Sequence, residues 1–310
     1  MTYPVEILLP ACNGEKYLST QIDSLLRQSY ENWRLIIRDD ISSDNTPRLI
    51  NEYKAKYPDK IHVLDNLSVK KGVIRSFECL LQASSARYVA FCDQDDAWFP
   101  DKLQLQVQKI QELEARHGHS MPILVHTDLT VVGDQLRTIS QSFWEYQHLR
   151  PADMCRLHRL LVQNCVTGCT VLINRPLIEM ALPFPDGLIM HDWWLALIAV
   201  SEGIVCDMKT PTVKYRQHDT NDTGARRWDL TLIFRAIVQG RESQLQSLNK
   251  TRIQAEALLQ ANVLNDLNRR IVEKYVSLYD ANWFVRRIEM LRMGFFKYRV
   301  IRNIAMFLRI

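Results

Sequence analysis

Residues 5 to 132 alternate between strand-like and helix-like segments, and this alternation restricts the possible folds more than any other feature of the chain. Apolar, β-favouring runs predict strands, which are Val5–Ala11, Arg34–Asp40, Ile61–Asn66, Tyr88–Asp93 and Ile123–Val132. Helical periodicity predicts the intervening helices, which are Glu15–Gln28, Thr46–Tyr57, Val73–Ala83 and Pro100–His117. We therefore expect an α/β protein whose mostly parallel sheet is flanked by helices.

Two of the predicted strands end in clusters of carboxylates. Asp39 and Asp40 close the second strand, and Asp93, Asp95 and Asp96 follow the fourth. A buried carboxylate without a partner is costly, so these groups must meet solvent, a cation or a ligand. Ligands of open α/β sheets bind at the carboxyl ends of the strands, where both clusters fall. This coincidence predicts a site, although a solvated acidic turn or a helix cap explains each cluster taken alone.

The second cluster has the chemistry of a metal site. Closely spaced carboxylate oxygens, as in Asp93-Gln94-Asp95, suit a hard divalent ion such as Mg²⁺ or Mn²⁺. Such an ion neutralises the charge of a nucleoside diphosphate as its bond to a sugar breaks. The pattern therefore favours a metal-dependent transferase that acts on a sugar nucleotide.

A further acid stands at the start of an apolar helix predicted over Asp192–Ser201. Asp192 either acts as a general base, which removes the proton of an attacking sugar hydroxyl, or simply complements the helix dipole. The adjacent Trp193 and Trp194 either form a stacking platform for sugar rings or belong to the core.

Two short strands are predicted at Val205–Met208 and Thr212–His218. At the end of the second, Arg216 is a candidate clamp for a diphosphate. His218 is a candidate ligand for a metal or a phosphate, although a lone histidine is more often structural.

After about Trp228 the pattern is entirely helical. The predicted helices lie near Leu230–Gln239, Glu242–Asn262, Asn265–Tyr279 and Trp283–Leu308. We therefore divide the chain into a domain over residues 1–225 and a helical region over residues 226–310. The stretch from Trp283 to Ile310 carries seven basic residues against one acidic residue, together with apolar residues at helical spacing. This composition is typical of a helix on anionic lipid, and the alternative is a packed helix with a solvated basic face.

Composition limits the remaining possibilities. A formal net charge of +4 is too weak to indicate nucleic acid as a partner. The seven cysteines form no CxxC pair and no zinc spacing, which suits a reducing cytosol. We expect neither a signal peptide nor a transmembrane helix.

Several motifs together resemble a known family. Leu8–Leu18, Ile36–Asp40 and Phe91–Trp98 are similar to the corresponding motifs of family 2 glycosyltransferases with the GT-A fold. Val166–Thr170 and Met190–Trp194, together with the segment that begins at Tyr215 and ends at Asn221, resemble a narrower group. That group comprises the rhamnosyltransferases that build rhamnose-rich cell-wall polysaccharides in Gram-positive bacteria.

The resemblance implies an inverting, metal-dependent glycosyltransferase with a role for each candidate residue. Asp192 is the implied catalytic base, and Mn²⁺ or Mg²⁺ is the implied cofactor. The implied metal ligands are Asp95, Asp93 and His218. The implied contacts of the nucleotide sugar are Pro10, Asn13, Asp39, Asp40, Asp93 and Arg216. The implied acceptor side comprises Thr167, Gly168, Cys169, Trp193 and Trp194.

The implied donor is dTDP-L-rhamnose, and the implied acceptor is a polyprenyl-linked saccharide at the cytoplasmic face of the cell membrane. The protein would then be cytoplasmic and peripheral on the membrane, through its C-terminal helices. Those helices could equally pair two copies of the chain.

Two residues depart from the family pattern. Ile41 stands where glycine commonly follows the Asp-Asp pair, and a β-branched residue resists positive φ. Cys12 stands where a hydroxyl residue is usual.

Three alternatives stay open. The donor could carry a galactosyl or glucosyl group instead. A nucleotidyltransferase is disfavoured because Ala11–Gly14 supplies one glycine where a phosphate loop needs several. A non-catalytic scaffold on the membrane surface would not need acids at three strand or helix ends.

Overall fold

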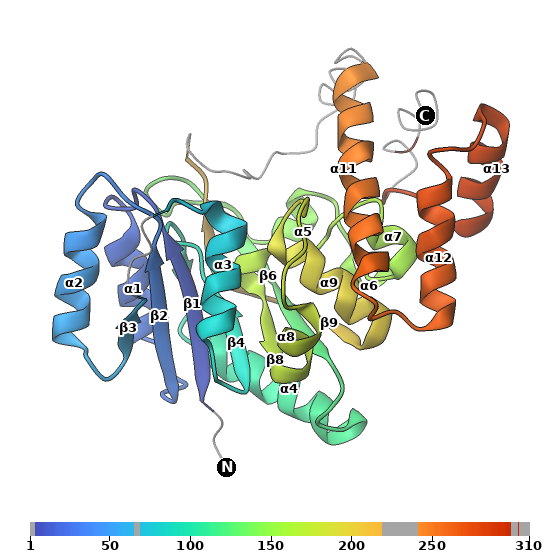
Figure 1. Ribbon diagram of the computed structural model, residues 1–310. Coiled ribbons are helices and arrows are strands. Elements are labelled where there is room, and N and C mark those ends of the chain that lie inside the picture. The colour runs from blue at the N-terminus through green and yellow to red at the C-terminus, as the bar shows by residue number, and fades with distance from the viewer. Residues whose placement is uncertain (1–3, 65–68, 219–240, 299–302, 304–310) are drawn as a thin grey trace. The chain divides into compact units, whose positions relative to one another are not determined.

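The computed structural model describes residues 4–64, 69–218, 241–298 and 303 (Figure 1). The chain divides into two compact units, and each is described by itself. The first unit comprises residues 1–143, 167–184 and 206–225. The second comprises residues 144–166, 185–205 and 226–310, so it includes the predicted helical region and two earlier segments. The functional division at residue 225 stays a prediction.

The first unit is built on a nine-stranded sheet, in which eight strands follow the order β3-β2-β1-β4-β8-β6-β9-β5 and β7 pairs with β6. The strands are β1 Val5–Ala11, β2 Trp33–Asp39, β3 Ile61–Val63, β4 Tyr88–Phe91, β5 Ala97–Trp98, β6 Ile123–Val132, β7 Thr138–Ser140, β8 Leu172–Asn174 and β9 Ile204–Arg216. Strands β3, β2, β1 and β4 are parallel, whereas β8 pairs antiparallel with both β4 and β6. The carboxyl ends of β1, β2 and β4 therefore meet at one edge, as the alternation predicted.

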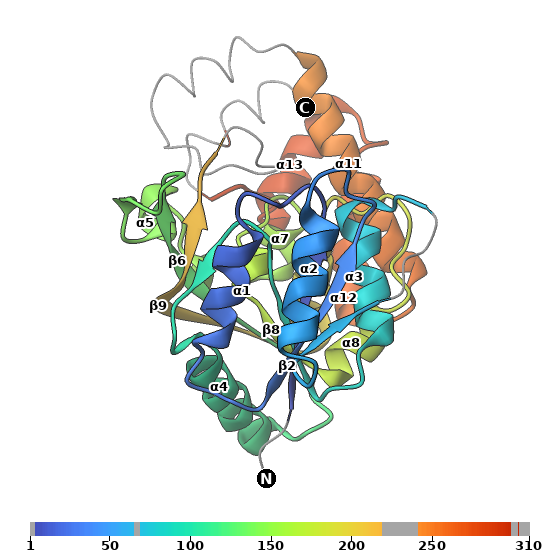
Figure 2. The same ribbon diagram turned by 90° about the vertical axis from the view of Figure 1, so that its left-hand side faces the viewer.

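Helices on both sides of the sheet bury one face each (Figure 2). They are α1 Leu18–Leu26, α2 Thr46–Lys56, α3 Gly72–Ala83, α4 Lys102–His117 and α8 Arg175–Ala181. In α4 the residues Leu103, Val107 and Ile110 recur at helical spacing and are buried. Figure 2 shows α1 and α4 on one side of the strands and α3 and α8 on the other. The predicted α/β class is thus confirmed.

The structure corrects several predicted boundaries in this unit. The predicted strands Val205–Met208 and Thr212–His218 form one strand, β9, which passes through Pro211. A proline is tolerated where the strand does not need its N–H group, so Pro211 does not interrupt β9. The helix predicted from Glu15 begins at Leu18, and the strand predicted over Ile61–Asn66 ends at Val63. The two-residue strand β5 was missed because it is too short to show a period.

The described helices of the second unit include α6 Pro151–Met154, α7 Leu157–Leu160, α9 His191–Glu202, α11 Arg241–Gln260, α12 Asp266–Ser277 and α13 Trp283–Met293. The short helix α5, Phe143–Tyr146, begins at the boundary between the units. Helix α9 is buried almost all round, which explains its continuous apolar sequence. Asn265 and Asn282 cap α12 and α13 by accepting hydrogen bonds from the backbone N–H groups of Asn268 and Val285.

The helix predicted over Trp283–Leu308 is wrong in its length. Helix α13 ends at Met293 because Gly294 takes a left-handed conformation, with φ of 72°. Phe295 then turns into the core, where its ring lies 5.1 Å from that of Tyr275. The helix predicted at Leu230–Gln239 lies outside the described residues. Across the described part of the chain, no helix has the length and apolar character that crossing a membrane requires.

Candidate active site

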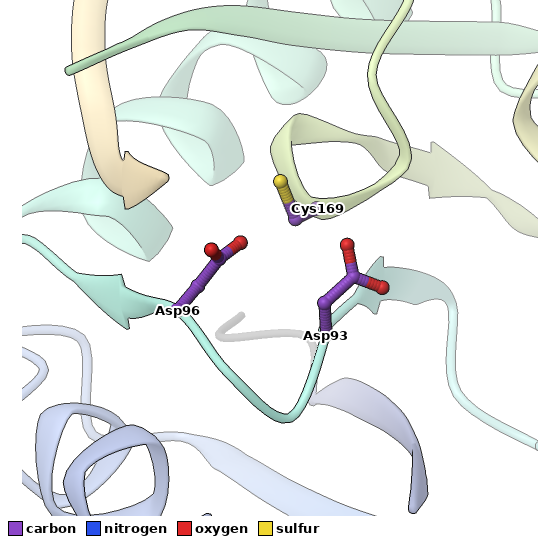
Figure 3. Close-up of side chains that lie close together, drawn as sticks. All are labelled: Asp93, Asp96 and Cys169. Atoms are coloured by element: carbon purple, nitrogen blue, oxygen red, sulfur yellow. The ribbon is translucent and has the colours of Figure 1, made fainter. Parts of the chain in front are cut away.

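The second acidic cluster lies on the loop between β4 and β5, at the edge of the sheet of the first unit. Figure 3 shows Asp93 and Asp96 on this loop, with Cys169 opposite them on the short 3₁₀ helix Gly168–Thr170. One ligand atom of each of these three side chains lies within 4.8 Å of the others. The segment predicted to line the acceptor side is thus folded against one of the predicted metal ligands.

Asp96 is fully buried and serves the fold. Its Oδ1 accepts a hydrogen bond from the backbone N–H of Arg216 at 3.0 Å, which fastens the loop to β9. Burial, and then the charges of Asp95 and Asp93, raise the pKa of Asp96 well above its usual value. Burial likewise raises the pKa of Cys169, so its sulfur stays a neutral thiol and is a poor ligand for a hard cation.

Asp95 is paired with His218, although the two are far apart in sequence. His218 Nε2 and Asp95 Oδ2 share a hydrogen bond of 2.8 Å. Arg216 Nε also donates to the backbone oxygen of Asp95 at 2.6 Å. Two of the predicted metal ligands, Asp95 and His218, therefore lie together with Arg216, a predicted contact of the nucleotide sugar.

An aromatic ring that the sequence did not single out supports this group. The ring of Tyr17 stacks on His218 with 4.7 Å between centroids, and the guanidinium of Arg216 lies 4.7 Å from the Tyr17 ring centre. The Tyr17 hydroxyl donates to Asp134, which also forms an ion pair with Lys16 at 3.0 Å. Tyr17 and Asp134 were missed because a single tyrosine after a turn and a single aspartate in a hairpin form no sequence motif that would predict a functional site.

Gln94, between the two candidate metal ligands, joins the acidic loop to the end of β1. Its amide accepts from the Cys12 N–H and donates to the Cys12 carbonyl, both at 2.9 Å. Only the main chain of Cys12 takes part, so this contact does not require the hydroxyl residue that is usual there. A Cβ on Gly14 would lie 2.3 Å from Gln94 Oε1, which accounts for a glycine at that position.

The loop after β2 keeps a backbone conformation that glycine prefers. Ile41 has φ of 61°, so the isoleucine occupies the left-handed turn that the family pattern implies. The loop is held by Asn13, whose N–H donates to Ser42 Oγ at 2.8 Å and whose Oδ1 accepts from the Ser43 N–H at 2.8 Å. Asp39 accepts from the N–H and the hydroxyl of Ser42. Ile41 thus adopts the positive φ that a β-branched residue resists.

Asp40 is committed to internal contacts. Arg38 Nη1 donates to its Oδ1 at 2.6 Å, and the N–H groups of Lys71 and Gly72 donate at 2.8 and 2.7 Å. Burial alone would raise the pKa of Asp40, but these hydrogen bonds from Arg38 and the backbone hold it below 3.8. Asp40 therefore anchors the start of α3.

The second unit holds the predicted base. Asp192 lies in the first turn of α9, mostly buried, and its Oδ1 accepts a hydrogen bond from Asn164 Nδ2 at 3.3 Å. Burial lowers the pKa of the adjacent His191 to about 3, so that imidazole is neutral.

The two tryptophans after Asp192 have different surroundings. Trp194 is buried in the core, so of the two alternatives that the sequence left open it takes the second, and it offers no surface for the acceptor sugar that the resemblance implied. Trp193 is half-buried, and its Nε1 donates to the Leu160 carbonyl at 2.6 Å.

Comparisons with known proteins agree with the fold. A family model described as "Glycosyl transferase family 2" matches residues 6–177. The chain is 27% identical over 244 residues to the UDP-Glc:alpha-D-GlcNAc-diphosphoundecaprenol beta-1,3-glucosyltransferase WfgD of Escherichia coli, covering 74% of this chain and 85% of that one. It is 26% identical over 229 residues to the dTDP-rhamnosyl transferase RfbG of Shigella flexneri, covering 69% and 72%.

A solved structure has the same fold. The mannosyltransferase PcManGT from Pyrobaculum calidifontis, in complex with GDP-Man and Mn²⁺, superposes with a TM-score of 0.53 at 14% identity. The match covers 95% of this chain and 86% of that one. The predicted GT-A fold is confirmed.

Proposed function

The chain belongs to glycosyl transferase family 2, and from that premise we propose that it transfers L-rhamnose from dTDP-L-rhamnose, with inversion, to a lipid-linked saccharide of a cell-wall polysaccharide. The observation that carries the transferase chemistry is the group formed by Asp95, His218 and Arg216 at the sheet edge. The rhamnosyl donor is supported by the motifs shared with rhamnosyltransferases and by the similarity to the Shigella protein.

A divalent cation fits the donor set. Asp93 and Asp95 offer carboxylate oxygens, which Mn²⁺ and Mg²⁺ prefer, and His218 offers an imidazole nitrogen beside them. The neutral thiol of Cys169 does not compete as a ligand. The ion, held by Asp95, Asp93 and His218, would supply a positive charge to the leaving diphosphate.

The chain's own residues divide the remaining work. Arg216, fixed by the Asp95 carbonyl and the Tyr17 ring, supplies a permanent positive charge for the diphosphate. Asp192 takes the proton of the acceptor hydroxyl as it attacks the anomeric carbon. Asn164 orients that carboxylate through its hydrogen bond to Oδ1.

A donor panel tests the proposal directly. Purified protein is incubated with Mn²⁺, a polyprenyl-diphosphate saccharide and each of dTDP-rhamnose, UDP-glucose and UDP-galactose, and the products are weighed by mass spectrometry. A mass gain of one deoxyhexose with dTDP-rhamnose alone is the expected result. A hexose gain instead would favour the second candidate, a glucosyltransferase, which the similarity to the Escherichia coli protein supports.

The base assignment has its own test. Asp192→Asn keeps the shape of the side chain, so donor binding should persist while turnover falls by about 10² or more. Asp186→Asn, at another acidic position of the same unit, is the control. Transfer at the parental rate by the Asp192 variant would remove it from the mechanism.

The proposed acceptor also sets the location. A saccharide on a polyprenyl carrier is held at the membrane, so the protein would act as a peripheral protein on the inner face. The name of the Escherichia coli relative, which includes a diphosphoundecaprenol acceptor, supports this class of acceptor.

A further inference from the structure

Helix α13 presents a continuous apolar face to solvent. Its outward side chains are each between 44% and 72% exposed, and they are Trp283, Phe284, Val285, Ile288 and Leu291. Phe284, Ile288 and Leu291 follow the i, i+4, i+7 spacing that places side chains in one line along a helix. Large apolar side chains that gather on one exposed face usually mark an interaction surface.

The opposite face fixes the helix in its unit. Met290 is buried, and Asn282 caps the first turn. Arg286 donates to the carbonyl oxygens of Leu278, Tyr279 and Ala281, at 2.7 to 3.1 Å. The exposed face therefore belongs to a helix that is firmly held, and its apolar side chains stand in fixed positions.

Charge identifies the occupant. The guanidinium of Arg287 lies 3.6 Å from the Trp283 ring centre, and the Arg292 side chain is 73% exposed at the end of the apolar line. The acidic residue of the helix, Glu289, is mostly covered and forms ion pairs with Lys274 at 3.2 Å and with Arg292 at 3.5 Å, so two cations face one carboxylate. The face thus combines aromatic and aliphatic side chains with positive charge.

We propose that α13 docks on an anionic lipid bilayer, with Phe284, Ile288 and Leu291 entering the boundary between headgroups and acyl chains. Eleven residues span about 16 Å as a helix, so α13 lies along the surface and does not cross it. Arg287 and Arg292 then face lipid phosphates. A two-fold contact between two copies of this face is the competing occupant, and the experiment distinguishes it from lipid.

Vesicle flotation without donor or acceptor tests this surface. The full chain should float with vesicles of phosphatidylglycerol and phosphatidylcholine and stay behind with phosphatidylcholine alone. Phe284→Asp combined with Ile288→Asp should lower the fraction bound at least tenfold, because two anchors are lost and two negative charges are added. Arg292→Gln should lower the apparent affinity about fivefold, and added salt should reduce this difference.

Matched controls lie on the neighbouring helix α12. Leu267, 70% exposed, and Arg270 are outward residues there, so Leu267→Asp and Arg270→Gln should leave flotation unchanged. Equal losses from both sets of variants would mean that overall charge or hydrophobicity is responsible, and would overturn the proposal. So would an absence of flotation with either lipid mixture. Size exclusion with light scattering tests whether a second copy of the chain binds this face instead of lipid. A dimer that the α13 variants dissociate would overturn the proposal in favour of that second copy.

The binding assay is independent of catalysis. If the protein floats with vesicles but transfers no sugar, the lipid-binding surface is supported and the proposed function is contradicted. If the protein transfers rhamnose but does not float, only the proposed lipid-binding surface is contradicted. The relevance of docking to a lipid-linked acceptor rests on the proposed function.

Discussion

The carboxyl ends of β2 and β4 look alike in sequence, and yet their buried acids are in opposite states. Asp40, after β2, contacts the buried guanidinium of Arg38, and its pKa is lowered. Asp96, after β4, is surrounded by other acids, and its pKa is raised by burial and by their charge. Lys102, also buried there, has its pKa lowered to about 7 by burial. The first end is thus an ionised pair that holds a loop, whereas at the second end burial favours the neutral forms of Asp96 and Lys102.

This difference shows that a carboxylate at a strand end is not a ligand by virtue of its position alone. What distinguishes Asp95 is a partner with two roles, since the His218 imidazole can share its proton or face a cation. Asp40 has only donors that are fixed by the fold. We therefore expect substitutions at the two ends to separate activity from stability.

The largest expected effect is on transfer. Asp95→Ala should lower turnover about 10³-fold, because the cation that supports the leaving diphosphate would lose its main ligand. Calorimetric titration of the nucleotide with and without Mn²⁺ should show the metal-dependent part of the affinity disappear. The unfolding midpoint should change little.

Asp59→Ala, at an exposed position of the same unit, serves as the control for both measurements. Metal-dependent binding that survives in the Asp95 variant would show that the two strand ends do not differ in the way we argue.

The next effect is on stability. Asp40→Asn should lower the free energy of unfolding by about 3–5 kcal/mol, because Arg38 would remain buried without a charged partner. Urea denaturation measures the loss, with Asp59→Asn as the control. A loss within 0.5 kcal/mol would contradict the anchoring role.

The fold itself was largely predictable from periodicity and turn chemistry. Strand β6 has the predicted bounds, and helix α3 differs by one residue at its start. The pairing of Asp95 with His218 was expected only from the family resemblance, because the spacing of residues so far apart in sequence predicts no contact. The Tyr17–Asp134 contact was not predicted, since it depends on where β6 and β7 place their hairpin. The end of α13 at Gly294 was missed, although a glycine there is a stop signal for a helix.

A pH dependence should distinguish the two ends further. The lowered pKa of Asp40 contributes stability above pH 3.8, which is lost as pH falls through its folded-state value. Lys102 also makes stability rise with pH, but at higher pH, and its buried charge costs stability instead of adding it. Between pH 7 and 10.5 the unfolded chain holds a proton that the folded chain lacks, so stability rises with pH in that window.

Lys102→Met removes the buried ammonium and should stabilise the protein most below pH 7, with an advantage that shrinks as pH approaches 10.5. Melting temperatures from pH 5 to 10, in a chelating buffer, measure the difference from the parent. Lys56→Met, at an exposed position, should give a flat difference over the same range. A flat difference for Lys102→Met as well would mean that this lysine titrates normally in the folded state.

The smallest expected effect concerns the turn after Asp40. An L-residue with a Cβ pays about 1–2 kcal/mol in the left-handed region, and the strain is greater for a β-branched side chain. Ile41→Gly removes that strain, against a smaller loss from the freer unfolded chain, and should raise the free energy of unfolding by about 0.5–1 kcal/mol.

Ile139→Gly is the matched comparison for this turn. Ile139 is an isoleucine of similar exposure in the strand β7, outside the left-handed region, so its substitution should cost about 0.5–1 kcal/mol. Opposite signs for the two variants would establish that Ile41 is held against its preference by the bonds between Asn13 and the following serines. If both variants lose stability, the turn carries no strain, and the isoleucine there has a packing role that offsets its backbone.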